Sequence, residues 1–237
     1  MIPLRDERRT TRLPWVTWAI IAANVAVFAY TMRLSTSLLG PDGSAVGSFF
    51  ARFAFVPARF TAAPFSAGAW VTVFAAMFMH GGWLHIGFNM LYLWVFGNDV
   101  EDRLGPLRYL LFYLVCGVVA TLTQWFAAPS SAVQVIGASG AIAGVLGSYV
   151  LLYPRSKITT LIPLFIIFEV AQVPAWIVIG VFFLLQVASA AVSLGNASSG
   201  GVAVFAHIGG FLAGMALTIP LVVSDRLTRR LDGGSVR

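Results

Sequence analysis

One serine and three histidines are the residues of this chain whose types could support nucleophilic chemistry. Ser139 lies in the run GASG that begins at Gly137, and the histidines are His80, His85 and His207; all of them stand in apolar stretches. Polar, protonatable side chains at membrane depth are costly and are therefore treated first as functional. A serine hydroxyl becomes a nucleophile only when a base removes its proton. We predict that His207 is this base, because it alone lies on a different segment from the other two histidines.

Two further side chains could stabilise the negative charge that such a reaction develops. His85 and Asn89 are four residues apart, so they share one face of a helix. Both can donate hydrogen bonds, and the backbone N–H of Ser139 at a helix start would be a third donor. The alternative is that His85 and Asn89 form an ordinary hydrogen-bonding pair between helices, worth about 0.6–2 kcal/mol.

His80 is interpreted as structural. It precedes His85 by five residues, which would place the two rings roughly 140° apart on a regular helix. We therefore expect His80 to bond to the loop backbone around Gly81 and Gly82. A zinc site made of the three histidines is disfavoured by this geometry and by the lack of a carboxylate or cysteine ligand.

Small residues surround the serine and His207. For Ser139 itself, the alternative to catalysis is close helix packing through small residues. The same interpretation is adopted for the glycine pairs Gly140 with Gly144 and Gly210 with Gly214, which would bring two helices within reach of a short serine side chain.

Composition places the chain among integral membrane proteins. It is 59% hydrophobic and 10% charged, whereas soluble domains carry roughly 25% charged residues. Its net charge of +6 resides at the termini and in short loops, so we predict a lipid bilayer and no nucleic acid as partner. A single cysteine, Cys116, allows no intrachain disulfide and no cysteine metal site. The N-terminus resembles the start of a signal peptide, but the apolar run that follows is long enough to be a retained helix.

Hydrophobic runs predict an all-α, polytopic membrane bundle of six transmembrane helices, since a span needs about 20 apolar residues. The domain would cover 15–223, between tails at 1–14 and 224–237. The expected spans are 15–32, 72–96, 107–127, 136–153, 174–193 and 202–223. The connection 33–70 contains short amphipathic pieces, and 158–170 is interpreted as a re-entrant or interfacial segment. Both ends, to about Thr10 and after about Leu227, are expected to be disordered.

Basic residues set the expected orientation. With six spans, one side holds most of them and the other holds only Arg33, Arg52 and Arg59. Both termini are therefore expected to be cytoplasmic, with Ser139 and the histidines in the outer half of the bilayer. The basic residues of the first side are Arg5, Arg8, Arg9, Arg12, Arg103, Arg108, Arg155, Lys157, Arg226, Arg229, Arg230 and Arg237.

Four segments together resemble the rhomboid family of intramembrane serine proteases, and the resemblance extends from the first span to the sixth. The segments are HGGWLHIGFNM (80–90), GNDVEDRLG (97–105), GASGAIAG (137–144) and AHIGGFLAG (206–214). The resemblance implies Ser139 as nucleophile, His207 as base, and an oxyanion hole made by His85, Asn89 and the Ser139 N–H. It also implies cleavage of transmembrane protein substrates near their outer ends, without metal or cofactor.

Two parts of the family pattern bear on the structure. Glu101, Arg103 and Gly105 match the family's cytoplasmic structural turn, although residues 98–105 alone suggest a solvated cap with salt bridges. Some rhomboids carry an aromatic ring four residues after the nucleophile, which packs on the imidazole. This chain has Ala143 there.

A protease is not the only function that these residues allow. A rhomboid-like protein that binds membrane clients without cleaving them is the main alternative, disfavoured because both Ser139 and His207 are present. A proton-coupled transporter would be expected to carry an intramembrane carboxylate, which the six spans lack. Haem ligation by His85 and His207 is geometrically possible, and a colourless protein would exclude it. The short tails and the Arg, Ala and Val bias suggest a bacterial inner membrane.

Overall fold

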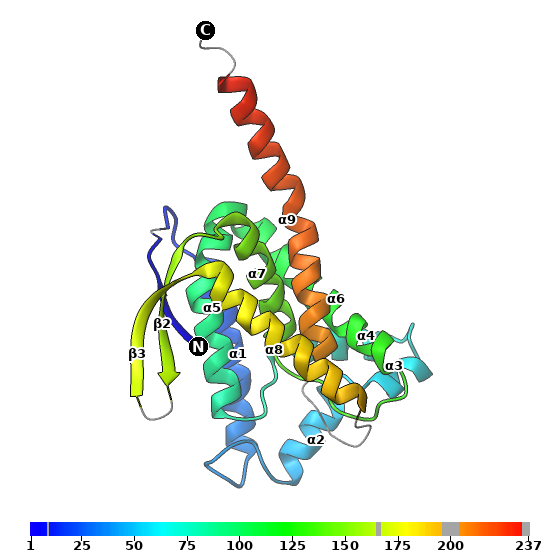
Figure 1. The fold of residues 1–237 in the computed structure, drawn as a ribbon. Helices are drawn as coiled ribbons and strands as arrows, with labels where there is room; N and C mark the ends of the chain where they lie inside the picture. Colours follow the sequence, from blue (N-terminus) through cyan, green and yellow to red (C-terminus); the bar gives the residue numbers. More distant parts are fainter. Residues whose placement is uncertain (9, 165–166, 196–203, 234–237) are drawn as a thin grey trace.

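The computed structural model describes the chain except for residues 9, 165–166, 196–203 and 234–237, and most of what it describes is helical (Figure 1). Two strands, β2 (Lys157–Leu164) and β3 (Ile167–Pro174), lie in the chain between the seventh and eighth helices. The helices are α1 Trp15–Leu34, α2 Ser44–Phe53, α3 Pro57–Ala62, α4 Ala67–Ala75, α5 Trp83–Leu104, α6 Pro106–Ala127, α7 Ser139–Leu152, α8 Ala175–Gly195 and α9 Val204–Gly233, with a short 3-10 helix, η1, at Ala76–Phe78.

Three of the described helical segments are long and apolar enough to cross a membrane. These are α1, α6 and the part Val204–Ser224 of α9, and the bent pair formed by Ala67–Phe78 and α5 could make a fourth. The apolar segments α7 and Ala175–Leu185 are shorter than a span. A membrane bundle is thus supported by the structure, while six complete spans remain a prediction.

The expected continuous span 72–96 was wrong, because the chain bends by 82° between Ala67–Phe78 and α5. Met79 has an extended backbone, and α5 begins only at Trp83. The pair Gly81–Gly82 lies within this break, where two poor helix formers in succession make an ideal helix unfavourable.

A three-stranded antiparallel sheet corrects both the all-α prediction and the expected re-entrant segment at 158–170. Its strands are β1 Ile2–Asp6, β2 Lys157–Leu164 and β3 Ile167–Pro174, in the order β1-β2-β3. The sequence ITTLIP in β2 is rich in β-branched residues, which favour strands over helices. The N-terminus, expected to be disordered, pairs with β2 from Ile2 to Asp6. At the other end of the chain, α9 remains helical to Gly233, so the expected disorder after Leu227 was also wrong there.

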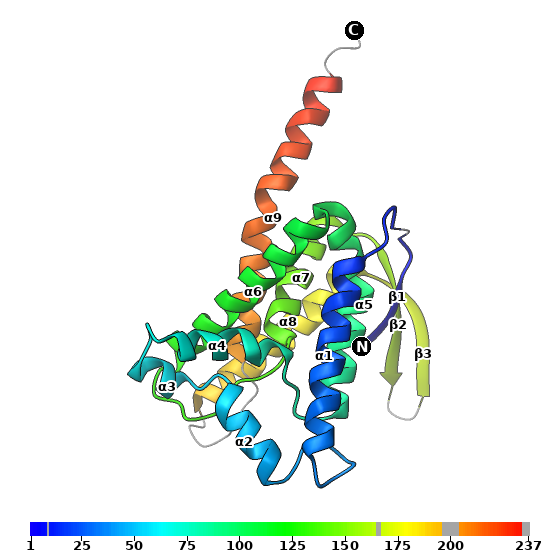
Figure 2. The ribbon, with the colours of Figure 1, turned by 180° about the vertical axis from the view of Figure 1, so that it is seen from behind.

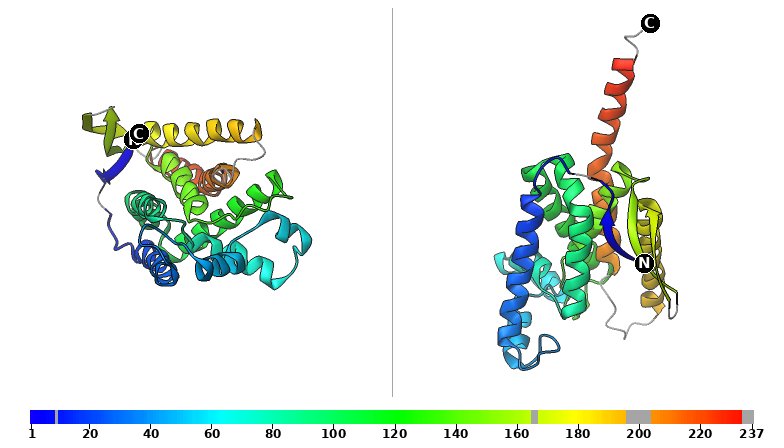
Figure 3. Two further views of the ribbon diagram at one scale, coloured as in Figure 1. Left: turned by 90° about the horizontal axis from the view of Figure 1, so that it is seen from below. Right: turned by 90° about the vertical axis from the view of Figure 1, so that its left-hand side faces the viewer.

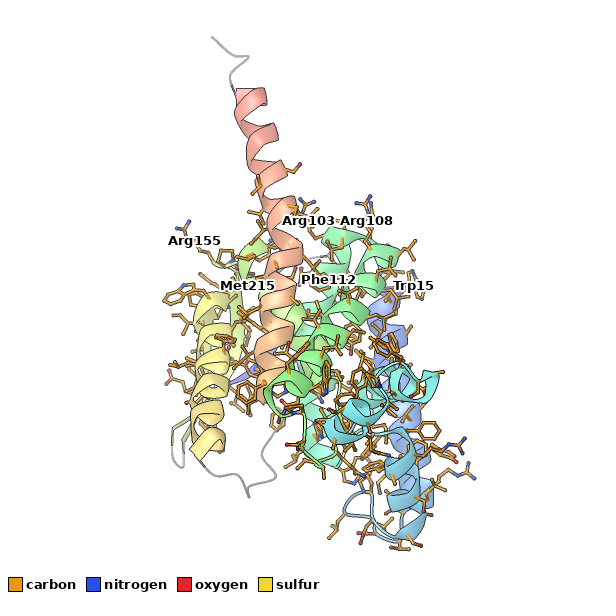
Figure 4. All side chains as sticks on the ribbon, turned by 90° about the vertical axis from the view of Figure 1, so that its right-hand side faces the viewer. Trp15, Arg103, Arg108, Phe112, Arg155 and Met215 are labelled. Atoms are coloured by element: carbon orange, nitrogen blue, oxygen red, sulfur yellow. The ribbon has the colours of Figure 1, made fainter. Side chains whose placement is uncertain are left out.

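Helix α7 lies at the centre of the bundle, where it contacts α5, α6 and α9. Its residues from Gly140 to Tyr149 are all buried. Figure 2 shows α2, α3 and α4 at the end of the molecule opposite to the projecting end of α9. Arg103, Arg108 and Arg155 lie at the end from which α9 projects (Figure 4), which is called the arginine-rich end below.

The charged segment 98–105 is not the solvated cap expected from its residues alone. Glu101 is only 3% exposed, and its carboxylate accepts hydrogen bonds from the backbone N–H groups of Val16 and Thr17 at 2.9 and 2.7 Å. The Thr17 hydroxyl donates to it as well, at 2.7 Å. A carboxylate at a helix N-terminus satisfies N–H groups that lack intrahelical partners and complements the helix dipole. Glu101 therefore fixes the start of α1 to the end of α5.

The N-terminal strand is fixed at the same end by Asp6. Its carboxylate accepts hydrogen bonds from the Tyr149 hydroxyl of α7 and, at 2.8 Å, from the Ser156 hydroxyl. Arg8 forms an ion pair of 3.3 Å with Asp99 of α5. Side chains from β1, α5 and α7 are thus joined by charge and hydrogen bonds at the arginine-rich end.

Candidate active site

The segment before α7 is held in place by backbone hydrogen bonds to residues of the segment between α1 and α5. Phe55 and Val135 form an antiparallel bridge, and the Gly137 N–H donates to the Ala76 carbonyl at 2.8 Å. Gly137 has φ +123°, a conformation that side chains rarely allow. This turn delivers Ser139 to the first position of α7.

Glycines let α7 and α9 approach to backbone contact. A Cβ on Gly210 would overlap the Gly140 carbonyl oxygen, and one on Gly214 would overlap the Gly144 carbonyl oxygen. The two helices therefore meet through the four glycines that the sequence suggested for helix packing. In a bilayer such close approach stabilises association by van der Waals packing, because lipid offers no hydrophobic gain between helices.

This contact brings Ser139 and His207 together. His207 lies in the first turn of α9 and is 7% exposed. Its Nε2 is 2.7 Å from the Ser139 Oγ, a hydrogen-bonding distance. The arrangement allows Nε2 to accept the hydroxyl proton when the other ring nitrogen carries the imidazole hydrogen.

His85 approaches the serine from α5. Its Nδ1 accepts a hydrogen bond of 3.4 Å from the Gly81 N–H. In a neutral imidazole the hydrogen then resides on Nε2. The position that a Cβ of Gly137 would occupy is 2.7 Å from this Nε2 and 3.5 Å from the Ser139 Oγ. Because Gly137 has no side chain, there is space between the His85 ring and the Ser139 hydroxyl. The Nε2–H of His85 borders this space.

Asn89 is buried one turn further along α5, with 7% of its surface exposed. Its amide nitrogen has no hydrogen-bond partner among the described residues. An unpaired buried donor is costly unless a ligand or water satisfies it. The N–H of Ser139, at the first position of α7, likewise has no partner within its own helix.

The interpretation of His80 was wrong in its geometry. Because the helix is broken before α5, His80 and His85 do not lie on one regular helix, and their ring centroids are 5.0 Å apart. The Gly81 N–H bonds to His85 rather than to His80, whose ring nitrogens have no partner among the described residues. Within the described part of the chain, the three histidines do not form a group of side chains that could hold a metal ion.

Two residues near His207 were missed by the sequence reasoning. The Gln124 side chain of α6 accepts a hydrogen bond of 3.2 Å from the Ala206 N–H, which fixes the first turn of α9. Phe182 of α8 lies with its ring centroid 6.4 Å from that of His207. A lone glutamine in an apolar span was a usable signal, but nothing in the apolar α8 distinguishes Phe182 from its neighbours.

Fold and site define a helical membrane protein with a serine and a histidine in hydrogen-bonding contact at one end of its central helix. A model of the Rhomboid domain matches residues 67–224, and the chain belongs to the rhomboid family.

The relatives carry both protease and rhomboid-like names. RHOMBOID-like protein 2 of Arabidopsis thaliana is 30% identical over 92% of this chain and 70% of its own length. Rhomboid-type serine protease 2 of Emericella nidulans is 32% identical over 69% of this chain and 29% of its own. Rhomboid protease GluP of Bacillus subtilis is 37% identical over 34% of this chain and 15% of its own length. The match covers 29% and 50% of two further Arabidopsis relatives, a chloroplastic and a mitochondrial one, so the chain spans half or less of those proteins.

Proposed function

We propose that this protein is an intramembrane serine endopeptidase that hydrolyses transmembrane protein substrates with Ser139 as nucleophile and His207 as base. The observation that carries the proposal is the 2.7 Å contact between the His207 Nε2 and the Ser139 Oγ. One relative named as a serine protease and another named as a rhomboid protease support the reaction class.

The positions of these groups support the following reaction. As the Ser139 Oγ attacks the peptide carbonyl carbon, its proton passes to the His207 Nε2, and the carbonyl oxygen becomes an oxyanion. The His85 N–H, the Asn89 amide and the Ser139 N–H stabilise this oxyanion, and each such donor typically contributes about 10²–10³ in rate. Collapse breaks the C–N bond, and the imidazolium gives its proton to the leaving amine. Water, deprotonated by His207, then attacks the acyl-enzyme and releases Ser139.

We further propose that the arginine-rich end, with the projecting end of α9, is cytoplasmic and that cleavage occurs near the outer face. The placement of Arg103, Arg108 and Arg155 at one end of the bundle supports this orientation (Figure 4). Ser139 begins α7, and the segment 153–157 that carries Arg155 follows the other end of this helix. A 14-residue helix is about 21 Å long, so the serine lies far from the arginine-rich end. A bacterial inner membrane remains our prediction from composition.

The orientation is tested with a single cysteine at Ser37, in the connection between α1 and α2, in a Cys116→Ala background. An impermeant maleimide should label it in intact cells. Labelling that appears only after the membrane is broken would show that this connection is cytoplasmic and that the orientation is the reverse of the one proposed.

Activity is tested by treating the purified protein with a fluorophosphonate probe and by following cleavage of a transmembrane substrate in liposomes. Ser139→Ala and His207→Ala should each abolish both signals, because the two groups act as a unit. Ser37→Ala is the matched control and should behave as wild type. Substrate binding without probe labelling in the unmodified protein would instead favour the client-binding alternative.

A further inference from the structure

The three-stranded sheet has two chemically different faces. Residues paired across neighbouring strands lie on the same face, and successive residues of a strand alternate between faces. Ile158 and Thr160 of β2 are fully buried, so this part of their face is turned to the helices. Towards the hairpin the same face is not buried, and Glu169 on it is exposed. The opposite face carries Val170, paired with Leu161, and Phe168, paired with Pro163. Val170 and Phe168 are 59% and 65% exposed.

Polarity on this outer face changes along the strands. Near the arginine-rich end the face carries Lys157 and the pair of Thr159 with Gln172, whereas towards the hairpin it carries the apolar pairs of Val170 and Phe168. Strand β1 shows the same change from polar to apolar residues. Its Arg5 pairs with Thr159, and its Ile2 pairs with Leu161, while Leu4 at the irregularity between them is 41% exposed. A face solvated by water along its whole length would give no reason for this gradient.

The sheet lies beside a segment that is apolar enough to span the membrane. Strand β1 contacts α5, and α5 belongs to the bent candidate span. Figure 1 and the right-hand view of Figure 3 show the hairpin of β2 and β3 running back along α5, away from the arginine-rich end. The left-hand view of Figure 3 places the sheet at the outside of the bundle, beside α5 and the start of α8.

We propose that the outer face of this sheet is a lipid-binding surface of the bilayer leaflet at the arginine-rich end. Phe168, Val170 and Leu161 contact acyl chains, and Lys157 and Arg5 lie at the level of anionic headgroups. The apolar residues are thereby shielded from water, and each basic side chain near an anionic surface gains favourable electrostatic energy. The proposal requires membrane insertion of the bundle and is independent of proteolysis.

Glu169 does not lie on the face assigned to lipid. It is exposed and pairs with Ile162, so it lies on the opposite face from Phe168 and Val170. The outer edge of β3 has no neighbouring strand in the described sheet.

The test uses single cysteines at Phe168, Val170 and Gln172 in a Cys116→Ala background, each carrying a nitroxide label in liposomes with anionic lipid. Oxygen, which concentrates in acyl chains, and a water-soluble nickel chelate compete to relax the label. Leu111, 56% exposed on the spanning helix α6, gives the bilayer reference. Circular dichroism and gel filtration exclude misfolded variants.

We expect labels at Phe168 and Val170 to show the high oxygen and low nickel accessibility of the Leu111 label, and the label at Gln172 to show a higher nickel accessibility. Nickel access at Phe168 and Val170 equal to that at Gln172 would place the face in water. Protection of both from oxygen and nickel would show that protein covers the face. Either result overturns the proposal, and neither depends on whether Ser139 is a nucleophile.

Discussion

Replacing Gly210 by alanine should separate the serine from the histidine without altering either side chain. The new Cβ would overlap the Gly140 carbonyl oxygen, and real Cβ contacts under 3.0 Å force a shift. The overlapping atom belongs to the backbone of α7, so relief requires the helices to move apart, by about 1 Å for normal van der Waals contact. A shift of that size would lengthen the 2.7 Å contact between His207 and Ser139 beyond hydrogen-bonding range.

The expected loss for Gly210→Ala is about 10²-fold in cleavage rate, the typical cost of a 1 Å misplacement. Initial rates on a transmembrane substrate in liposomes, with fluorophosphonate labelling in parallel, measure it. Gly180→Ala is the matched control, because a Cβ there meets nothing within 4 Å. Wild-type rates in a folded Gly210→Ala protein would refute the claim that glycine contact between α7 and α9 sets the geometry of the pair.

Three other substitutions separate the roles of neighbouring groups. Asn89→Ala should slow turnover by about 10²–10³ while leaving substrate binding intact, since two other donors remain for the oxyanion; an unchanged kcat in a folded variant would make Asn89 structural. Glu101→Ala removes the acceptor of three hydrogen bonds at the start of α1 and should lower the free energy of unfolding by about 3 kcal/mol, whereas Glu101→Gln should lower it less. Thermal unfolding in detergent measures both variants, and stability equal to that of the wild type in both would contradict this role. Phe182→Ala removes the ring beside His207 and should lower kcat more than it raises KM, whereas a change in KM alone would place Phe182 in substrate binding.

The helical part of the fold was predictable because hydropathy is read over long windows. The predicted spans at 15–32 and 107–127 agree with α1 and α6 to within two residues. The second span failed because its window average conceals Gly81 and Gly82, which permit a sharp bend. The sheet failed for a different reason. Its β1 and β2 are separated by 150 residues, and apolar runs at period two and at period 3.6 cannot be distinguished in so short a segment.

The chemically distinctive residues of the site could be placed from sequence, and the residues that position them could not. Ser139 and His207 are rare polar groups in apolar segments, so their type and depth predict a meeting that the structure now shows as a 2.7 Å contact. The orientation of His85 depends on the Gly81 N–H, which faces it only because the helix is broken. Regular helix geometry therefore gave the wrong relation between His80 and His85 while placing His85 and Asn89 correctly on α5.

The two ends of the bundle are held together by different forces, and this separates stability from activity. At the arginine-rich end, Glu101 and Asp6 accept hydrogen bonds from groups far apart in the sequence, and breaking charge-assisted contacts of buried groups costs folding free energy. At the other end, glycine contacts set the distance between Ser139 and His207 but add few polar bonds. Substitutions at Asp6 should therefore act mainly through unfolding. Substitutions at Gly210 should act mainly through the geometry of the pair, because small displacements cost more in a transition state than in packing.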